Sequence, residues 1–386
     1  MKKIAIITAT RAEYGLLKPV VESLRKYESK DFKVEVIVTG THLSGKHGNT
    51  ITEIEKDNIH INYKIYIPVD SSDANDISNN QAETLVKFTN FFIEKKYDAV
   101  VILGDRYEAL SIAIAAGNTN TPLFHLCGGD TTEGASDEWI RHSITKMSYL
   151  HFVTNEESKK RVVQLGEDPC RVFNYGSTSI DNILNIEMLT KEEALRSVGV
   201  KKCQYAVCTY HPVTIDDKDI VWKVCQFLNV AREFPNIEFI VTKSNADQGG
   251  SNINMLLDKE EKNIDNVHVF ASIGTWHYLS LVKYCEFVLG NSSSGIIEAP
   301  ALHVPTVNIG DRQRGRQQCE SIINCGESTK EIVAAINHVM DKEFKEACKA
   351  VGNPYGDGTA SAKIAEKIIE IVKNGRINLK KKFYNL

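Results

Sequence analysis

Short apolar runs alternate with amphipathic stretches along the first half of the chain. The runs read KIAIITAT, FKVEVIVTG, YDAVVILGD and TPLFHL, and the amphipathic stretches predict helices at Tyr14–Tyr27 and Ala82–Lys95. Continuous apolar strands that are separated by helices are typical of a parallel sheet covered on both faces. The first half is therefore predicted to be a doubly wound α/β domain.

The same pattern resumes after CRVFNYGSTSIDNIL, with YAVCTYHP, a helix at Val221–Phe234, IEFIVTKS, VHVFAS, CEFVLGN and TVNIGD. We therefore predict two Rossmann-like domains, 1–172 and 173–359. The hinge is expected at Glu167–Ser177, which holds Gly and Pro. A last helix at Ala360–Asn374 can pack on either domain, so the segment 360–386 is a candidate to join the first.

Composition excludes several classes of protein. A length of 386 residues fits two cores, and the net charge of −4, with both signs interspersed, indicates neither a nucleic-acid footprint nor a polybasic membrane patch. The basic tail KNGRINLKKKF is expected to be a solvated end. Nine scattered cysteines form no CxxC pair, MKKIAIITAT runs straight into a strand, and no apolar run approaches the ~20 residues of a membrane span. A cytoplasmic protein with reduced thiols is expected.

The loop after the strand CEFVLG is a candidate anion site. Ligands of open parallel sheets bind at the carboxyl ends of the strands, so function is expected in the cleft between the domains. Here Ser292 and Ser293 precede a helix, whose N-terminus attracts an anion such as diphosphate, although an ordinary helix cap explains them equally well. Glu298, one turn on, is placed to reach a ribose. The loop has neither the P-loop lysine nor GxGxxG spacing, and Arg312 follows the next strand with two further arginines.

Two strand ends of the first domain carry charged pairs. Arg11 follows the first strand in TATRAEYG and is expected to be a buried-loop ligand contact, with a surface salt bridge as the alternative. Asp105 and Arg106 end the apolar strand of VVILGDRYEAL. A carboxylate at such a place can act as acid or base, with a pKa set by burial and its neighbours, whereas capping the next helix is the competing role.

A third strand is followed by an acid-rich stretch, HLCGGDTTEGASDEWIRHSITK. It holds Asp130, Glu133, Asp137 and Glu138, which favours proton transfer, although the last two fit equally well as N-terminal acids of a helix. His211 ends the first strand of the second domain and is a candidate acid or phosphate contact. HExxH, paired-cysteine, DxDxDG and GxSxG patterns are missing from the sequence, so no metal and no serine nucleophile are predicted. Acid/base chemistry on a nucleotide-linked molecule remains.

These motifs resemble those of the hydrolysing UDP-N-acetylglucosamine 2-epimerases of sialic acid biosynthesis. The matching stretches run in the family's order over nearly the whole chain and read TRAEYG, TGTHLSGKHGNT, YDAVVILGDRYEAL, DEWIRHSITKMSYLHF, RVVQLGE, HPVT, SNAD and GNSSSGIIEAPALHVPTVNIGDRQRGR. The resemblance implies a glycosyltransferase-B-like fold with the nucleotide in the cleft, no cofactor, and a homodimer or homotetramer. It also implies elimination of UDP to a 2-acetamidoglucal, followed by hydration to N-acetylmannosamine.

Site residues are carried over from the resemblance by position. The residues that it places on UDP, with the serines on phosphate and Glu298 on ribose, are Arg11, Ser292, Ser293, Glu298 and Arg312, to which we add Arg106. The residues that it implies to be catalytic are Asp105, Asp137 and His211, with Glu138 as a further match. Several relatives carry a glutamate where this chain has Cys127. We expect Asp130 to do the work of that glutamate, and Glu133 is the alternative.

Other functions compete with this interpretation. A hydrolysing epimerase for a UDP- or GDP-2,4-diacetamido-6-deoxy sugar would use the same motifs, and NSSSGIIE and GDR favour it over a non-hydrolysing epimerase. A UDP-sugar glycosyltransferase of the same fold would need fewer carboxylates in the loop from Asp130 to Glu138. A sugar-nucleotide-binding regulator would bind without turnover.

Overall fold

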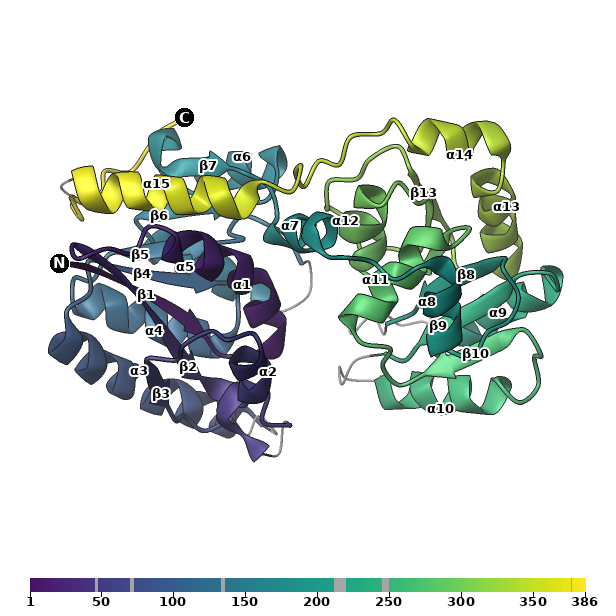
Figure 1. The fold of residues 1–386 in the computed structure, drawn as a ribbon, viewed down its shortest axis with the longest axis horizontal. Coiled ribbons are helices and arrows are strands. Elements are labelled where there is room, and N and C mark those ends of the chain that lie inside the picture. Colours follow the sequence, from purple (N-terminus) through teal and green to yellow (C-terminus); the bar gives the residue numbers. More distant parts are fainter. Residues whose placement is uncertain (46–47, 70–72, 133–135, 212–219, 245–249, 376) are drawn as a thin grey trace. The chain divides into compact units, whose positions relative to one another are not determined.

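The chain folds into two compact α/β units in the computed structural model, which describes residues 1–45, 48–69, 73–132, 136–211, 220–244, 250–375 and 377–386 (Figure 1). The first unit comprises Met1–Asn182 and Tyr355–Leu386, and the second comprises Ile183–Pro354. Each unit holds one parallel sheet with helices on both faces, which confirms the predicted fold class. None of the helices in the described ranges is long and apolar enough to cross a membrane.

The first unit is built on a seven-stranded parallel sheet in the order β3-β2-β1-β4-β5-β6-β7. Its strands are β1 (Lys2–Thr8), β2 (Phe32–Thr39), β3 (Tyr63–Ile65), β4 (Ala99–Leu103), β5 (Leu123–Leu126), β6 (Leu150–Val153) and β7 (Val172–Asn174). Its helices are α1 (Arg11–Arg25), α2 (Ile51–Lys56), α3 (Ala74–Lys95), α4 (Tyr107–Asn118), α5 (Ser136–Met147), α6 (Glu156–Gln164), the start of α7 (Thr178–Asn185) and α15 (Ala360–Asn374), with 3-10 turns at Gly40–Leu43 and Pro169–Arg171.

Alternate side chains of β1 enter different cores of the first unit. Ile4 and Ile6 pack with helices α1, α2 and α15, whereas Ala5 and Ile7 pack with α3, α4 and α5. Because successive residues of a strand point to opposite faces, a sheet that is covered on both sides needs apolar residues at every position. This requirement explains why the strands appear in the sequence as continuous apolar runs.

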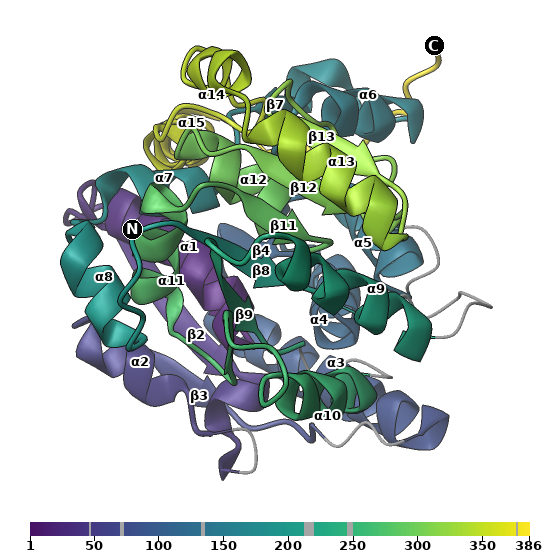
Figure 2. The same ribbon diagram turned by 90° about the vertical axis from the view of Figure 1, so that its right-hand side faces the viewer.

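The second unit holds a six-stranded parallel sheet in the order β10-β9-β8-β11-β12-β13, and the run from β9 to β13 can be followed in Figure 2. Its strands are β8 (Tyr205–Thr209), β9 (Glu238–Thr242), β10 (Val267–Phe270), β11 (Val288–Gly290), β12 (Thr306–Ile309) and β13 (Ile322–Cys325). Its helices are α8 (Lys191–Ser197), α9 (Ile220–Glu233), α10 (Gly250–Glu260), α11 (Thr275–Tyr284), α12 (Ser294–Ala301), α13 (Thr329–Val339) and α14 (Lys342–Cys348).

The second sheet is also covered on both faces. Ala206 and Cys208 of β8 pack with α9, α10 and α13, while Tyr205 and Val207 pack with α8, α11 and α12. Both sheets therefore share one plan. The chain runs outward from β1 or β8 in one direction and returns to build the other half from β4 or β11.

Two helices begin earlier than the hydrophobic pattern predicts. Helix α1 starts at Arg11, because the Thr10 side chain accepts a hydrogen bond from the Glu13 amide at 3.3 Å. Helix α3 starts at Ala74, after Asp73 caps it in the same way. Capping fixes a helix start through polar groups that precede the apolar stripe, so periodicity alone locates these ends late. Helix α15 has the predicted bounds.

The C-terminal segment belongs to the first unit. The Ser177 amide donates to the carbonyl of Tyr355 at 2.6 Å, and the Asp181 carboxylate accepts the amides of Ala360 and Ser361 at 3.0 and 2.6 Å. Asp181 of α7 thereby binds the N-terminus of α15, whose Ile368 is fully buried. Since these bonds lie beyond residue 172, the chain divides after Asn182 and not at the expected boundary.

Most of the described residues of the basic tail are exposed, as expected of a solvated end, but Lys381 anchors it to the first unit. The Lys381 ammonium donates to the fully buried Glu167 carboxylate at 2.8 Å and to the carbonyl of Ser148 at 2.6 Å. The amide of Tyr384 also donates to the carbonyl of Gly166 at 2.9 Å. The C-terminal strap, residues 377–386, thus connects α15 to the segment between α5 and β6 and to the residues that follow α6. Composition alone cannot reveal this, because the partner carboxylate lies more than 200 residues away in the sequence.

Candidate active site

Both sheets have a topological switch point, where neighbouring strands continue in opposite directions. It lies between β1 and β4 in the first unit and between β8 and β11 in the second. Ligands of doubly wound sheets bind at the carboxyl ends of the strands beside such a point. Asp105 follows β4, and His211 follows β8. The sequence therefore puts predicted site residues at both switch points.

Arg141 of α5 gathers the acidic cluster of the first unit. Its side chain is only 4% exposed, its Nε donates to Asp105 Oδ2 at 2.9 Å, and its Nη1 donates to the carbonyl of Asp130 at 2.7 Å. Nη1 also lies 3.2 Å from Glu138 Oε2. A planar guanidinium can hold several oxygen atoms in fixed directions, so Arg141 sets the relative placement of these residues. The motif DEWIRHSITK contains Arg141, but the pattern of the sequence does not predict this role.

The backbone before Asp105 is held by a buried histidine. His125 of β5 has no exposed surface, its Nε2 donates to the carbonyl of Gly104 at 2.8 Å, and its Nδ1 accepts from Thr145 Oγ1 at 3.3 Å. Burial lowers the pKa of His125 to about 3, which keeps the ring neutral and fixes its tautomer. The backbone that connects β4 to Asp105 is therefore held in place. Asp105 does not cap α4, since Arg106 occupies the cap position.

Asp130 follows β5 and turns its carboxylate toward the end of β6. Oδ1 accepts the hydroxyls of Thr154 and Ser158 at 3.0 and 2.5 Å. The preceding Gly129 has a φ of +84°, and a Cβ there would lie 2.3 Å from the carbonyl oxygen of Ser158. Only glycine permits this approach, so the GG pair brings the Asp130 carboxylate to its two hydroxyl partners. Asp130 is half-buried.

Asp137 and Glu138 both lie in the first turn of α5, which agrees with the alternative that they are N-terminal acids of a helix. Glu138 accepts the Thr132 amide at 2.5 Å and contacts His142 Nε2 at 3.0 Å. Burial acts to raise the pKa of Glu138, but the bonds from Thr132 and His142 outweigh it, and the pKa falls below its usual value. Glu138 is therefore an ionised partner of Arg141. Glu133, the alternative base, lies outside the described residues.

Cys127 stands at the position where several relatives of the predicted family carry glutamate. Its φ is +63°, and burial together with the charges of Asp130 and Asp105 raises the pKa of its thiol. A thiol held in its protonated form is no base near neutral pH. Proton transfer in this loop would therefore fall to the neighbouring carboxylates.

A second pair of carboxylates lies beside Asp105. Glu108 is 2% exposed and accepts Arg106 Nε at 2.7 Å, while Glu13 is 8% exposed and accepts the Ala9 amide at 3.0 Å. The other oxygen of each carboxyl is buried without a partner among the described residues. Burial, followed by the charge of Glu108, raises the pKa of Glu13 to about 8. Glu13 therefore keeps its proton at neutral pH, a state that the TRAEYG motif alone did not reveal.

Arg11 differs from the expected buried-loop arginine. It is the first residue of α1, its side chain is 56% exposed, and its Nε lies 3.5 Å from Glu53 Oε1. The Thr10 cap pulls this residue into the helix, which turns its side chain outward. The surface salt bridge of the alternative is present, and because the guanidinium is more than half exposed, its contact with a ligand stays a proposal.

In the second unit, the loop after β11 depends on one glycine. Gly290 has a φ of +136°, and a Cβ there would lie 2.0 Å from the carbonyl oxygen of Thr209. Ser292 Oγ accepts the Ser294 amide at 3.3 Å, whereas Ser293 occupies the N-cap of α12 without a capping bond from its side chain. The predicted phosphate serines thus lie in the turn that starts α12, where Ser292 bonds the amide of the first helical residue and Ser293 holds the cap position without a side-chain bond.

A relay of hydroxyls reaches Glu298. Tyr278 donates to Ser294 Oγ at 2.9 Å, and Ser294 donates to Glu298 Oε2 at 2.5 Å. Burial raises the pKa of Glu298, and the Ser294 bond opposes that change. Tyr278 was not predicted as a site residue, whereas the four-residue spacing of Ser294 and Glu298 is the signal that places both on one helix face.

His211, Asn291 and Arg312 meet at the carboxyl ends of three neighbouring strands, β8, β11 and β12. The Asn291 carboxamide binds the His211 backbone, and Arg312 Nη1 donates to the Asn291 carbonyl at 3.1 Å. Two residues predicted to contact diphosphate are therefore joined through one asparagine. The pattern of the sequence does not show this connection.

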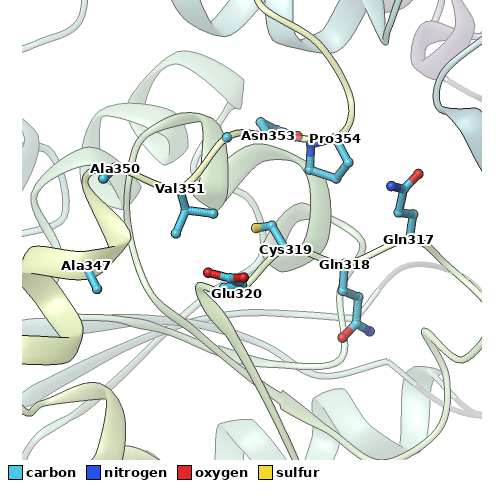
Figure 3. Close-up of a pocket in the computed structure, with 10 residues that line it drawn as sticks. Gln317, Gln318, Cys319, Glu320, Ala347, Ala350, Val351, Asn353 and Pro354 are labelled. Atoms are coloured by element: carbon cyan, nitrogen blue, oxygen red, sulfur yellow. The ribbon is translucent and has the colours of Figure 1, made fainter.

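A pocket of about 510 Å³ lies elsewhere in the second unit. Figure 3 shows that it is lined from two sides, by residues 317–320 and by Ala347 with residues 350–354. None of the residues that we predict to contact UDP lines this pocket.

Comparisons with known proteins agree over nearly the whole chain. A family model described as UDP-N-acetylglucosamine 2-epimerase matches residues 25–369. The chain is 38% identical over 390 residues to polysialic acid biosynthesis protein P7 of Escherichia coli, with 100% of this chain and 98% of that protein covered. It is 40% identical over 348 residues to a GDP/UDP-N,N'-diacetylbacillosamine 2-epimerase (hydrolyzing) of Campylobacter jejuni, with 89% of each covered.

A solved structure shares the fold. The crystal structure of UDP-N-acetylglucosamine 2-epimerase from Neisseria meningitidis, bound to UDP-N-acetylglucosamine, matches with a TM-score of 0.78 and 19% identity. The match covers 96% of this chain and 100% of that one. The fold is therefore glycosyltransferase-B-like, as the resemblance implied.

Proposed function

Because the chain belongs to the UDP-N-acetylglucosamine 2-epimerase family, we propose that it is a hydrolysing 2-epimerase, which converts UDP-N-acetylglucosamine and water to N-acetylmannosamine and UDP. Support for hydrolysis comes from the name of the Campylobacter relative. Support for a role in sialic acid biosynthesis comes from the name of the Escherichia coli relative.

The proposed reaction begins with an elimination. A carboxylate removes the proton from C2, the C1–O bond to UDP breaks, and its electron pair leaves with the diphosphate, which gives a 2-acetamidoglucal. Water then adds across the double bond, with a proton delivered to C2 from the opposite face and hydroxide to C1. No carbonyl adjoins C2 to acidify its proton, so the reaction needs positioned carboxylates and strong stabilisation of the leaving diphosphate.

The observation that carries the proposal is the carboxylate cluster around Arg141. One buried guanidinium binds the carboxylates of Asp105 and Glu138 and the backbone carbonyl of Asp130, and Asp137 lies in the same helical turn as Glu138. We assign the proton traffic to Asp105, Asp130 and Asp137. A transferase that moves a sugar to an acceptor would need fewer acids here.

The leaving diphosphate would be bound in the second unit. Ser292, Ser293 and Arg312 are assigned to phosphate, Glu298 to ribose, and His211 to the diphosphate or to protonation of the leaving group. The N-terminus of α12 would add its amides and dipole to this site. Arg11 and Arg106 of the first unit are assigned to UDP as cations.

A second candidate substrate is a UDP- or GDP-linked 2,4-diacetamido-6-deoxy sugar. The observation that favours it is the 40% identity to the Campylobacter diacetylbacillosamine epimerase. Steady-state kinetics with UDP-N-acetylglucosamine and with UDP- and GDP-N,N'-diacetylbacillosamine would separate the two. We expect the highest kcat/KM for UDP-N-acetylglucosamine, and a preference for either diacetamido sugar would replace it as the substrate.

The role of Asp130 can be tested by Asp130→Asn. The amide oxygen can still accept the hydroxyls of Thr154 and Ser158, so the fold and the UDP affinity should be kept. Turnover should fall by about 100- to 10,000-fold, the usual contribution of an acid or base. Asp168→Asn, which changes a carboxylate that only caps a 3-10 turn, is the matched control. Near-normal turnover of the Asp130 variant would move the assignment to Glu133.

A further inference from the structure

Asn291 makes a two-point contact with the backbone of His211. Its Oδ1 accepts the His211 amide at 2.7 Å, and its Nδ2 donates to the His211 carbonyl at 2.9 Å. Asn291 is 1% exposed, and His211 is 6% exposed. A buried amide or carbonyl without a partner is costly. The carboxamide supplies one acceptor and one donor in one plane, which no other side chain of this size can do.

The backbone of Asn291 connects the other two strand ends. Its amide donates to the carbonyl of Thr209 at 3.1 Å. Its carbonyl accepts Arg312 Nη1 at 3.1 Å and Gln313 Nε2 at 2.8 Å. One residue thus bonds the end of β8 on one side and the segment after β12 on the other, so that moving Asn291 would move both.

The His211 ring contacts a serine whose backbone is in turn held by a second asparagine. His211 Nδ1 lies 3.2 Å from Ser244 Oγ, and Ser244 follows β9. The amide and the carbonyl of Ser244 are both bonded by the Asn254 carboxamide, at 2.9 and 3.2 Å. Two asparagines therefore fix the backbone and the ring partner of one histidine. A histidine that served only as a filler of the core would not need its backbone and its ring to be fixed separately.

We propose that Asn291 is a positioning residue of the nucleotide site, which holds the His211 backbone and the Arg312 guanidinium in register at the diphosphate. This role rests on the proposed function, because it assumes that His211 and Arg312 contact UDP. The Asn291 side chain acts through His211 and does not itself touch the ligand, whereas Arg312 is bonded by the Asn291 backbone carbonyl, which alanine keeps. The resemblance to the epimerase family implied no role for Asn291.

The test is a double-mutant cycle on UDP binding, with wild type, Asn291→Ala, His211→Ala and the double variant, each titrated with UDP by calorimetry. Asn291→Ala should weaken UDP binding by about 10- to 100-fold, the effect of two buried hydrogen bonds. On the His211→Ala background it should change the affinity by less than about threefold, because the residue through which it acts is gone. An equal loss on both backgrounds would overturn the inference, and so would an unchanged affinity of Asn291→Ala.

Asn266→Ala is the matched control for stability. Asn266 is 7% exposed, and its Nδ2 donates to three carbonyls at 2.8 to 3.0 Å immediately before β10, at the opposite end of the same sheet. It should lower the unfolding temperature at least as much as Asn291→Ala and keep the UDP affinity within about twofold. If it weakened UDP binding as much, the effect would be one of stability, and the inference would fall. Wild-type protein that does not bind UDP would instead overturn the proposed function.

Discussion

Replacing Arg141 by methionine should unfold the first unit at a markedly lower temperature. The side chain is 4% exposed and donates to Asp105, Glu138, Thr132 and the carbonyl of Asp130. Methionine has a similar length and no charge, so it keeps the packing while leaving two carboxylates without their cation. The cost should come mainly from those unpaired charges.

The magnitude follows from the burial of the pair. Removing one partner of a buried ion pair costs about 3 to 5 kcal/mol. In a unit of roughly 200 residues, each kcal/mol lowers the unfolding temperature by about 2 to 4 °C, so the expected shift is roughly 6 to 20 °C. Lysine at the same position should lie between wild type and methionine, because it keeps the charge but not the planar fork.

Scanning calorimetry at pH 7 measures this shift. Arg25→Met is the control, because Arg25 makes one exposed hydrogen bond, to the carbonyl of His60, and should cost less than about 1 kcal/mol. Turnover of the Arg141 variant, measured well below its unfolding temperature, should also fall, since Asp105 loses the group that orients it. An Arg141→Met unfolding temperature within about 2 °C of wild type would refute this reasoning.

The remaining predictions concern other buried groups. The pKa of Glu13 is about 8 in the folded state, whereas the unfolded state loses this proton near the usual value of 4.5. The contribution of Glu13 to the free energy of unfolding therefore declines as the pH rises from 4.5 to about 8. Urea unfolding from pH 4 to 9 should therefore show the free energy of unfolding of Glu13→Gln rising relative to that of wild type through this pH range. Parallel plots of this free energy against pH for the two proteins would contradict the prediction. Lys381→Met should lower the free energy of unfolding by about 1 to 3 kcal/mol, because Glu167 loses part of its neutralisation, whereas Lys380→Met should leave it nearly unchanged. Equal denaturation midpoints of the two variants would exclude a role for the strap. Gly290→Ala should lower both stability and UDP affinity, because its Cβ would collide with the backbone of β8, and an unchanged calorimetric profile would show that the loop can adapt.

Much of the fold can be predicted from the sequence because parallel strands that are buried on both faces must be apolar throughout. The runs KIAIITAT and YDAVVILGD accordingly became β1 and β4, and α15 has its predicted bounds. The start of α1 was missed, since the Thr10 cap that sets it is polar. The unit that α15 joins could not be predicted, because an apolar helix face does not reveal what it packs against.

The candidate site was predictable in part for a similar reason. Asp105, Asp130 and His211 follow apolar strands, so topology alone brings them to strand ends. The role of Arg141 depends on partners from three different segments, which only folding brings together. The role of Asn291 depends on backbone groups of His211, and the sequence does not show the pairing of a side chain with a distant backbone.

The central claim is that the chain removes UDP by taking the C2 proton and then adds water. The most direct test is to incubate the protein with UDP-N-acetylglucosamine in deuterated water and to follow the sugar by proton NMR. The account predicts free N-acetylmannosamine that carries deuterium at C2, together with UDP. N-acetylmannosamine that retains hydrogen at C2, or intact UDP-N-acetylglucosamine in the presence of folded protein, would contradict it.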